Sequence, residues 1–128
     1  MKLNIKNETG RLKSVVLGQP KSIGPVPTLE ESYDAKSYYS IENGIYPKEE
    51  DIIAEMTAFE KVLKKYDVEV FRPNIIKDYN QVFARDVAFV IEDKMIISNV
   101  IKDRADEQEA YRKIFEKVEW RKIINLPE

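Results

Sequence analysis

Apolar residues between Pro47 and Tyr66 recur with the period of an α-helix. The positions that share one face are Ile52, Met56, Phe59, Leu63 and Tyr66. A proline opens the segment, acidic residues fill its first turn, and Lys64 and Lys65 stand at its far end, all of which suits the helix dipole. The pattern predicts an amphipathic helix over 47–66 whose apolar face packs in the core.

A second helical pattern runs from Asp103 to Val118. Asp103 stands where an N-cap residue belongs, and acidic residues follow it in the first turns. The apolar positions along one side are Tyr111, Ile114, Phe115 and Val118. We therefore predict a second amphipathic helix that packs through this side.

Short apolar runs predict the strands. They are residues 11–17 before Gly18, Val68–Phe71 before Pro73, Val87–Ile91, Met95–Ile97, and Trp120–Leu126. The runs on either side of Glu92-Asp93-Lys94 are rich in β-branched and aromatic residues, so they predict a β-hairpin buried on both faces. The order strand, loop, helix, strand, hairpin, helix, strand indicates an α/β fold.

The segment 19–47 shows no convincing period. It holds four of the six prolines and four tyrosines, Tyr33, Tyr38, Tyr39 and Tyr46. An unstructured connection of this length is far beyond the usual ~4–6 residues. We expect a long loop or lid, a binding loop, or a segment with short helical turns that the periodicity does not reveal.

Composition narrows the classes of function. The 128 residues suffice for a single domain, 1–128, with 21 Lys plus Arg against 23 Asp plus Glu spread along the chain. No basic patch suits nucleic acid, and no apolar run approaches the roughly 18 residues of a membrane span. We expect a cytoplasmic protein that needs no cofactor and no metal. The chain has no Cys and no His, so thiolate chemistry and the commonest general base are missing.

An ionic pair, Arg85 and Asp86, stands at the mouth of the predicted hairpin. A carboxylate at the edge of a core is costly unless it is paired. Two interpretations follow. Asp86 is neutralised by Arg85 as a structural ion pair, or it is held ready for a cationic ligand.

The residues Asn80-Gln81-Val82-Phe83-Ala84-Arg85-Asp86, followed by the hairpin and by Arg104 and Glu107, carry a family resemblance. The motif is similar to that in the N-terminal part of the guanidino-group-modifying enzymes, which include arginine deiminases, dimethylarginine dimethylaminohydrolases and amidinotransferases. The likeness extends to the strand 14–18 and the helix 47–66. It therefore covers nearly all of this chain but only the first part of the family.

The resemblance implies a fold and a site. The family forms a five-bladed β/α propeller, the pentein fold, and this chain would supply about two ββαβ-like blades of it. Asp86 would grip a substrate guanidinium, Phe83 would flank the substrate, and Asn80 would lie near the pocket. Arg104 would meet a substrate carboxylate. The implied partner is a small arginine-like guanidino compound, and whether the parent reaction is hydrolysis or amidino transfer stays open.

The family reaction uses a cysteine nucleophile and a histidine, and this chain has neither. The resemblance therefore predicts a guanidine-binding portion with no catalytic residue of its own, inactive alone. We expect a fragment of a longer enzyme, one polypeptide of a split assembly, or a descendant kept for binding, with self-association or a missing C-terminal part covering its open edges. The alternative is a binding or interaction module on the same scaffold, in which Arg85 and Asp86 only pair with each other.

Overall fold

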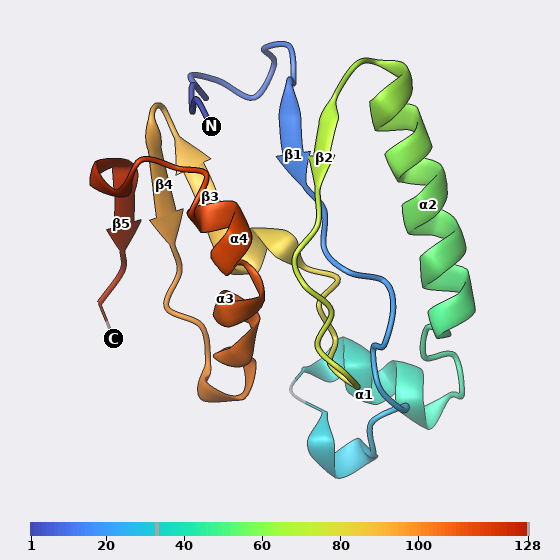
Figure 1. The fold of residues 1–128 in the computed structure, drawn as a ribbon. Coiled ribbons are helices and arrows are strands. Elements are labelled where there is room, and N and C mark those ends of the chain that lie inside the picture. The colour runs from blue at the N-terminus through green and yellow to red at the C-terminus, as the bar shows by residue number, and fades with distance from the viewer. Residues whose placement is uncertain (33, 128) are drawn as a thin grey trace.

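The structure, a computed structural model, describes residues 1–32 and 34–127 (Figure 1). Tyr33, one of the tyrosines noted above, and Glu128 lie outside the described residues, as does the side chain of Asp103. The strands are β1 (Ser14–Val16), β2 (Glu69–Phe71), β3 (Ala88–Ile91), β4 (Lys94–Ile97) and β5 (Ile123–Asn125). The helices are α1 (Ala35–Glu42), α2 (Glu49–Lys65), α3 (Asp106–Ala110) and α4 (Arg112–Phe115). The mixed α/β fold that the order of elements predicted is confirmed.

Two small sheets organise the chain. Strands β1 and β2 pair in parallel, while β3, β4 and β5 form a sheet in which β3 and β4 are antiparallel and β4 and β5 are parallel. Parallel neighbours need a long crossover, which α2 provides between β1 and β2 and α3 with α4 provides between β4 and β5. The chain thus repeats a strand, helix, strand unit.

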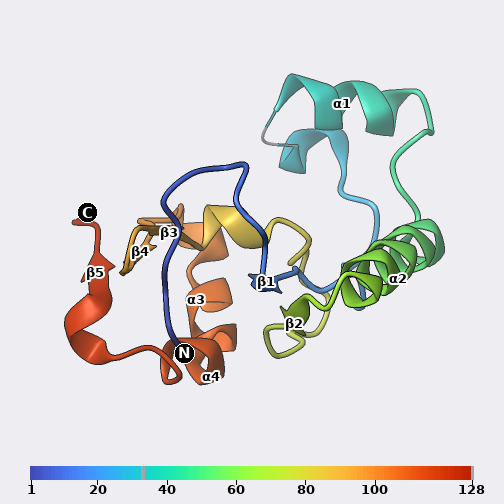
Figure 2. The same cartoon turned by 90° about the horizontal axis from the view of Figure 1, so that it is seen from above.

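Helices and sheets alternate through the molecule. Seen from above, α2, the β1–β2 pair, α3 with α4, and the three-stranded sheet follow one another (Figure 2). Three buried clusters hold these layers together: Leu17, Leu63 and Val68; Val87, Ala110, Tyr111 and Ile114; and Leu3, Met95 and Val118. The apolar side predicted for residues 103–118 is therefore confirmed as core. None of the described helices combines the length and the apolar character needed to cross a bilayer.

The hairpin is not buried on both faces, contrary to the prediction. Phe89 and Ile91 are 42% and 56% exposed, because the helices cover only one face of the three-stranded sheet. The predicted face of α2 is also only partly buried. Leu63 is in the core, but Phe59 and Tyr66 are 50% and 66% exposed, because the part of the chain that the structure describes covers this helix with no more than the narrow β1–β2 pair.

The helix predicted over 103–118 is divided into a 3-10 turn, η3 (Lys102–Arg104), followed by α3 and α4. Asp103 lies inside η3 rather than ahead of a helix, and the division at Tyr111 coincides with a tighter bond from its N–H to the Gln108 carbonyl. The strand predicted over Trp120–Leu126 begins with a 3-10 turn, and only Ile123–Asn125 pairs with β4.

The segment 19–47 contains short helical turns, the third of the options considered. It forms η1 (Leu29–Glu31) and α1, and α1 has no buried residue. This arm lies at one end of the molecule, away from both sheets (Figures 1 and 2). Its base is fixed, because the Asp78 and Tyr79 amides donate to Ser22 at 2.8 and 2.7 Å and the Ile23 amide donates to Glu49 at 2.9 Å.

Candidate functional site

A cavity of about 470 Å³ brings together all the side chains predicted to bind substrate, Asp86, Phe83, Arg104 and Asn80. They come from the loop before β3 and from η3. The remaining lining residues are Pro27, Glu31, Ser32, Asp34, Ser37, Tyr46, Asp78, Tyr79 and Ile101. The arm, residues 19–47 with η1 and α1, therefore builds the outer wall of the same cavity.

The loop that carries Asp86 is fixed by its approach to the end of β1. A Cβ atom on Gly18 would lie 2.2 Å from the carbonyl oxygens of Gln81 and Val82, so this position accepts only glycine. The backbone N–H of Gln19 donates to the backbone carbonyl of Gln81 at 3.0 Å. The Gln81 side chain is fully buried and bonds to the backbone of Asn74 and Ile76. The turn that follows is therefore placed by scaffold contacts rather than by a flexible loop.

Asp86 ends a 3-10 turn, η2 (Ala84–Asp86), and takes part in a three-residue ion network. Arg104 Nη1 donates to Asp86 Oδ2 at 2.7 Å, while Arg104 Nε and Nη2 donate to the two carboxylate oxygens of Glu107 at 2.6 and 3.0 Å. The Glu107 side chain is fully buried, and that of Arg104 is 25% exposed. Hydrogen bonds to the two carboxylates raise the pKa of Arg104 above its usual value, and the effect of Glu107 is larger than that of Asp86.

Asp86 keeps acceptor capacity for a ligand. Its side chain is 40% exposed, and Arg85 Nε stands 3.8 Å from Oδ1, beyond a normal hydrogen bond. The Arg85 side chain is 89% exposed, so this pair contributes little to stability. Of the two interpretations of Asp86, neutralisation by Arg85 is therefore the weaker. The close ionic partner of Asp86 is Arg104.

Phe83 and Asn80 have different parts in the cavity wall. Phe83 is 55% exposed, so its ring is free to flank a planar group. Asn80 Oδ1 accepts a hydrogen bond from the Val82 amide at 3.2 Å, which shapes the turn leading into the motif.

The outer wall adds carboxylates whose positions are set by local caps. Asp34 accepts from the Lys36 and Ser37 amides and from Ser37 Oγ, and the hydrogen bonds from Ser37 lower the pKa of Asp34. Glu31 accepts from the Thr28 amide and hydroxyl, which lower the pKa of Glu31. Among the described residues, no three acidic side chains are grouped closely enough to hold a metal ion.

Two residues of the site were missed from the sequence as site residues. Glu107 was noted only as part of the motif, although its spacing of three from Arg104 on a helix is a signal for an ion pair. Gln81 had no such signal, because nothing in a local pattern shows that a motif glutamine is buried and bonds to a distant backbone. Both residues position Asp86 or its partner rather than line the cavity themselves.

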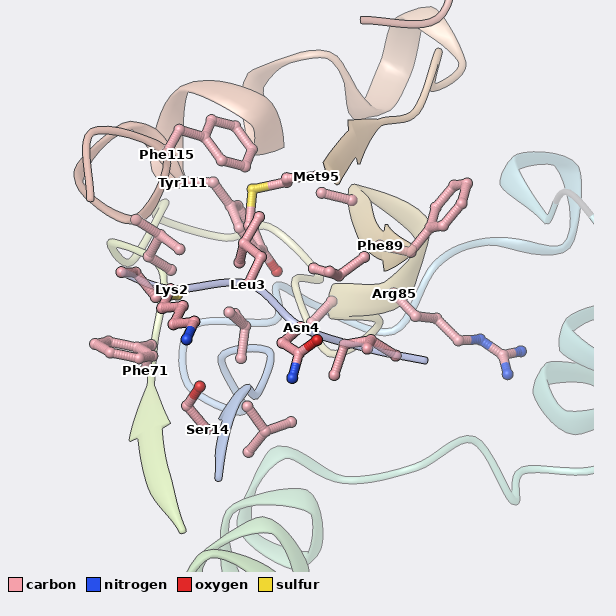
Figure 3. Close-up of a pocket in the computed structure, with 18 residues that line it drawn as sticks. Lys2, Leu3, Asn4, Ser14, Phe71, Arg85, Phe89, Met95, Tyr111 and Phe115 are labelled. Atoms are coloured by element: carbon pink, nitrogen blue, oxygen red, sulfur yellow. The ribbon is translucent and has the colours of Figure 1, made fainter. Parts of the chain in front are cut away.

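A second cavity, of about 320 Å³, lies between β1 and β3 and is lined mainly by apolar side chains (Figure 3). Its charged lining residues are Lys2 and Arg85, and the Arg85 guanidinium points away from it. Tyr111 is also among its lining residues; the Tyr111 hydroxyl is buried with no hydrogen-bond partner among the described residues, and burial raises the pKa of Tyr111. With no acidic side chain among its described lining residues, this cavity does not suit a guanidinium.

Comparison with known proteins supports the fold. No protein-family model and no curated protein matches this sequence. Among solved structures, SxtG, an amidinotransferase from Microseira wollei in the saxitoxin biosynthetic pathway, matches 98% of this chain with a TM-score of 0.67. The chain has the fold of part of an amidinotransferase. Sequence identity is 19%, and the chain spans 42% of the length of SxtG. The fold relationship that the motif implied is thus confirmed.

Proposed function

We propose that this chain is the guanidine-binding portion of a guanidino-group-modifying enzyme of the amidinotransferase, deiminase or dimethylargininase type. One observation carries the proposal. The side chains predicted from the motif line a single cavity, and the carboxylate of Asp86 is partly exposed there on a fixed turn. The fold shared with part of an amidinotransferase supports it.

Recognition follows from the geometry of the two charged groups. A guanidinium is permanently charged and offers parallel N–H donors, so a carboxylate is its natural receptor. Asp86 Oδ2 already accepts from Arg104, which orients the carboxylate and leaves Oδ1 for the ligand. Phe83, at the same cavity, supplies a ring face for the planar cation.

The reaction of the family needs a cysteine nucleophile and a histidine, in addition to the residues that would bind the guanidinium. The chain contains no Cys and no His, so a nucleophile and a proton-transfer group would come from outside the 128 residues. In the propeller that the family resemblance implies, the two repeated strand, helix, strand units would stand as about two blades. The alternative, a non-catalytic binding or interaction module, draws support from the same lack of Cys and His.

Calorimetric titration with butylguanidine tests the proposal. Wild-type protein should bind it, and Asp86→Asn should weaken binding about 10- to 100-fold, because a charge-assisted hydrogen bond contributes about 1.5–3 kcal/mol. Asparagine keeps an acceptor for Arg104, so folding should survive, and circular dichroism checks this. Asp93→Asn, in the hairpin turn outside the cavity, is the matched control. Equal affinities of wild type and Asp86→Asn would refute a receptor role for Asp86.

A further inference from the structure

The charge around the guanidine cavity bears on which guanidino compounds it accepts. Its described lining residues include four acidic side chains, Glu31, Asp34, Asp78 and Asp86, against a single basic one, Arg104. No lysine is among them. The far end of a bound guanidino compound therefore meets a surface that is predominantly acidic.

The one basic side chain is already compensated. Arg104 donates to Glu107 through Nε and Nη2 and to Asp86 through Nη1, so its positive charge lies between two carboxylates. A substrate carboxylate placed on Arg104 would approach Asp86 and Glu107 as well, and like charges repel at such distances. The contacts thus give Arg104 a positioning role and do not favour the prediction that it receives a substrate carboxylate.

The acidic residues of the outer wall hold their charge in fixed places. The hydrogen bonds that cap η1 and α1 keep Glu31 and Asp34 oriented and favour their ionised forms. Asp78, which lies outside the arm in the segment between β2 and η2, is less engaged, since its side chain is 61% exposed and its ion-pair partner Lys77 stands 3.9 Å away. Of Glu31, Asp34 and Asp78, Asp78 is therefore the acidic side chain best able to pair with the far end of a ligand.

We propose that the cavity selects guanidino compounds whose other end is cationic or neutral and discriminates against those that carry a carboxylate. This proposal rests on the proposed function, since it assumes that Asp86 receives the guanidinium. It replaces an arginine-like ligand by an aminoalkylguanidine as the preferred class, with Asp78 as a specificity-determining residue.

Three ligands with one guanidinium and different far ends provide the test: 4-aminobutylguanidine, butylguanidine and 4-guanidinobutyrate. In calorimetric titrations at low salt, the ammonium compound should bind at least tenfold more tightly than the carboxylate compound, with butylguanidine between them. The difference should shrink as ionic strength rises, because exposed charges are screened.

A matched variant locates the effect. Asp78 has a positive φ of 53°, a conformation that asparagine tolerates well, so Asp78→Asn removes the charge without straining the backbone. It should reduce the preference for the ammonium compound over butylguanidine severalfold, whereas Asp86→Asn should weaken all three ligands by a similar factor.

The outcomes separate the two proposals. If none of the three ligands binds the folded protein, the proposed function itself is refuted. If they bind with equal affinity, or 4-guanidinobutyrate binds most tightly, the guanidine site stands and the charge selection is overturned. A preference for the ammonium compound that Asp78→Asn leaves untouched would overturn the role given to Asp78.

Discussion

Replacing Glu107 by glutamine should destabilise the fold far more than its single lost charge suggests. The Glu107 side chain is fully buried and receives two hydrogen bonds from Arg104, whose side chain is 25% exposed. Removing one partner of a buried ion pair costs about 3–5 kcal/mol, because the other charge stays buried without compensation. Arg104 keeps some solvent contact and its bond to Asp86, so we expect the lower end, about 3 kcal/mol.

Urea denaturation followed by circular dichroism measures this loss. With an m value of about 1–3 kcal/mol/M for a small domain, a loss of about 3 kcal/mol should lower the midpoint by about 1–3 M. Glu109→Gln is the matched control, since Glu109 pairs with Arg112 at the same spacing and a similar distance, 2.6 Å, but both side chains are about two-thirds exposed at 64% and 65%. This control should cost less than about 1 kcal/mol. Equal losses in the two variants would refute the argument that burial controls the cost.

Three further outcomes are expected. Tyr111→Phe should leave the unfolding free energy unchanged or raise it by up to about 1 kcal/mol in the same assay, because it removes a buried hydroxyl without a described partner; a clear loss would reveal a hidden hydrogen bond. Bonds from Lys64 and then Arg72 lower the pKa of Glu60 below 4.5, so its stabilising effect is present above that pH and is lost on acidification. Glu60→Gln should therefore flatten the fall in stability between about pH 5 and 3, and an unchanged pH profile would contradict this. The isolated chain should self-associate in sedimentation velocity, since large apolar side chains such as Trp120, 75% exposed, remain uncovered; a monomer at all concentrations would speak against it.

Periodicity predicted the elements better than it predicted their surroundings. It located α2, and the terminal charges of that helix agree with its dipole. It could not show that only a two-stranded sheet lies against the helix, which is why Phe59 is half exposed. The hairpin was misjudged for the same reason, because a short apolar run does not reveal whether one or both faces of a sheet are covered.

The site was predicted from a motif, so the prediction reached only residues that lie in or near that motif in the sequence. The segment from Asn80 to Asp86 identified residues that do share a cavity. The partner that holds Arg104 was within reach of the sequence, three residues away at Glu107. The opposite wall was not, because α1 is a short helix without a buried face and the segment 19–47 shows no convincing apolar period.

The arm of residues 19–47 affects how the ligand preference of this protein can evolve. Because α1 contributes nothing to the buried clusters, the interior sets few requirements for its residue types. Replacement, lengthening or exchange of the residues between Pro27 and Tyr46 would reshape the ligand-facing wall while Asp86 stays fixed on its own side. A library randomised in this arm should therefore yield many folded variants with altered ligand preference, so that new selectivity can evolve at a low cost in stability.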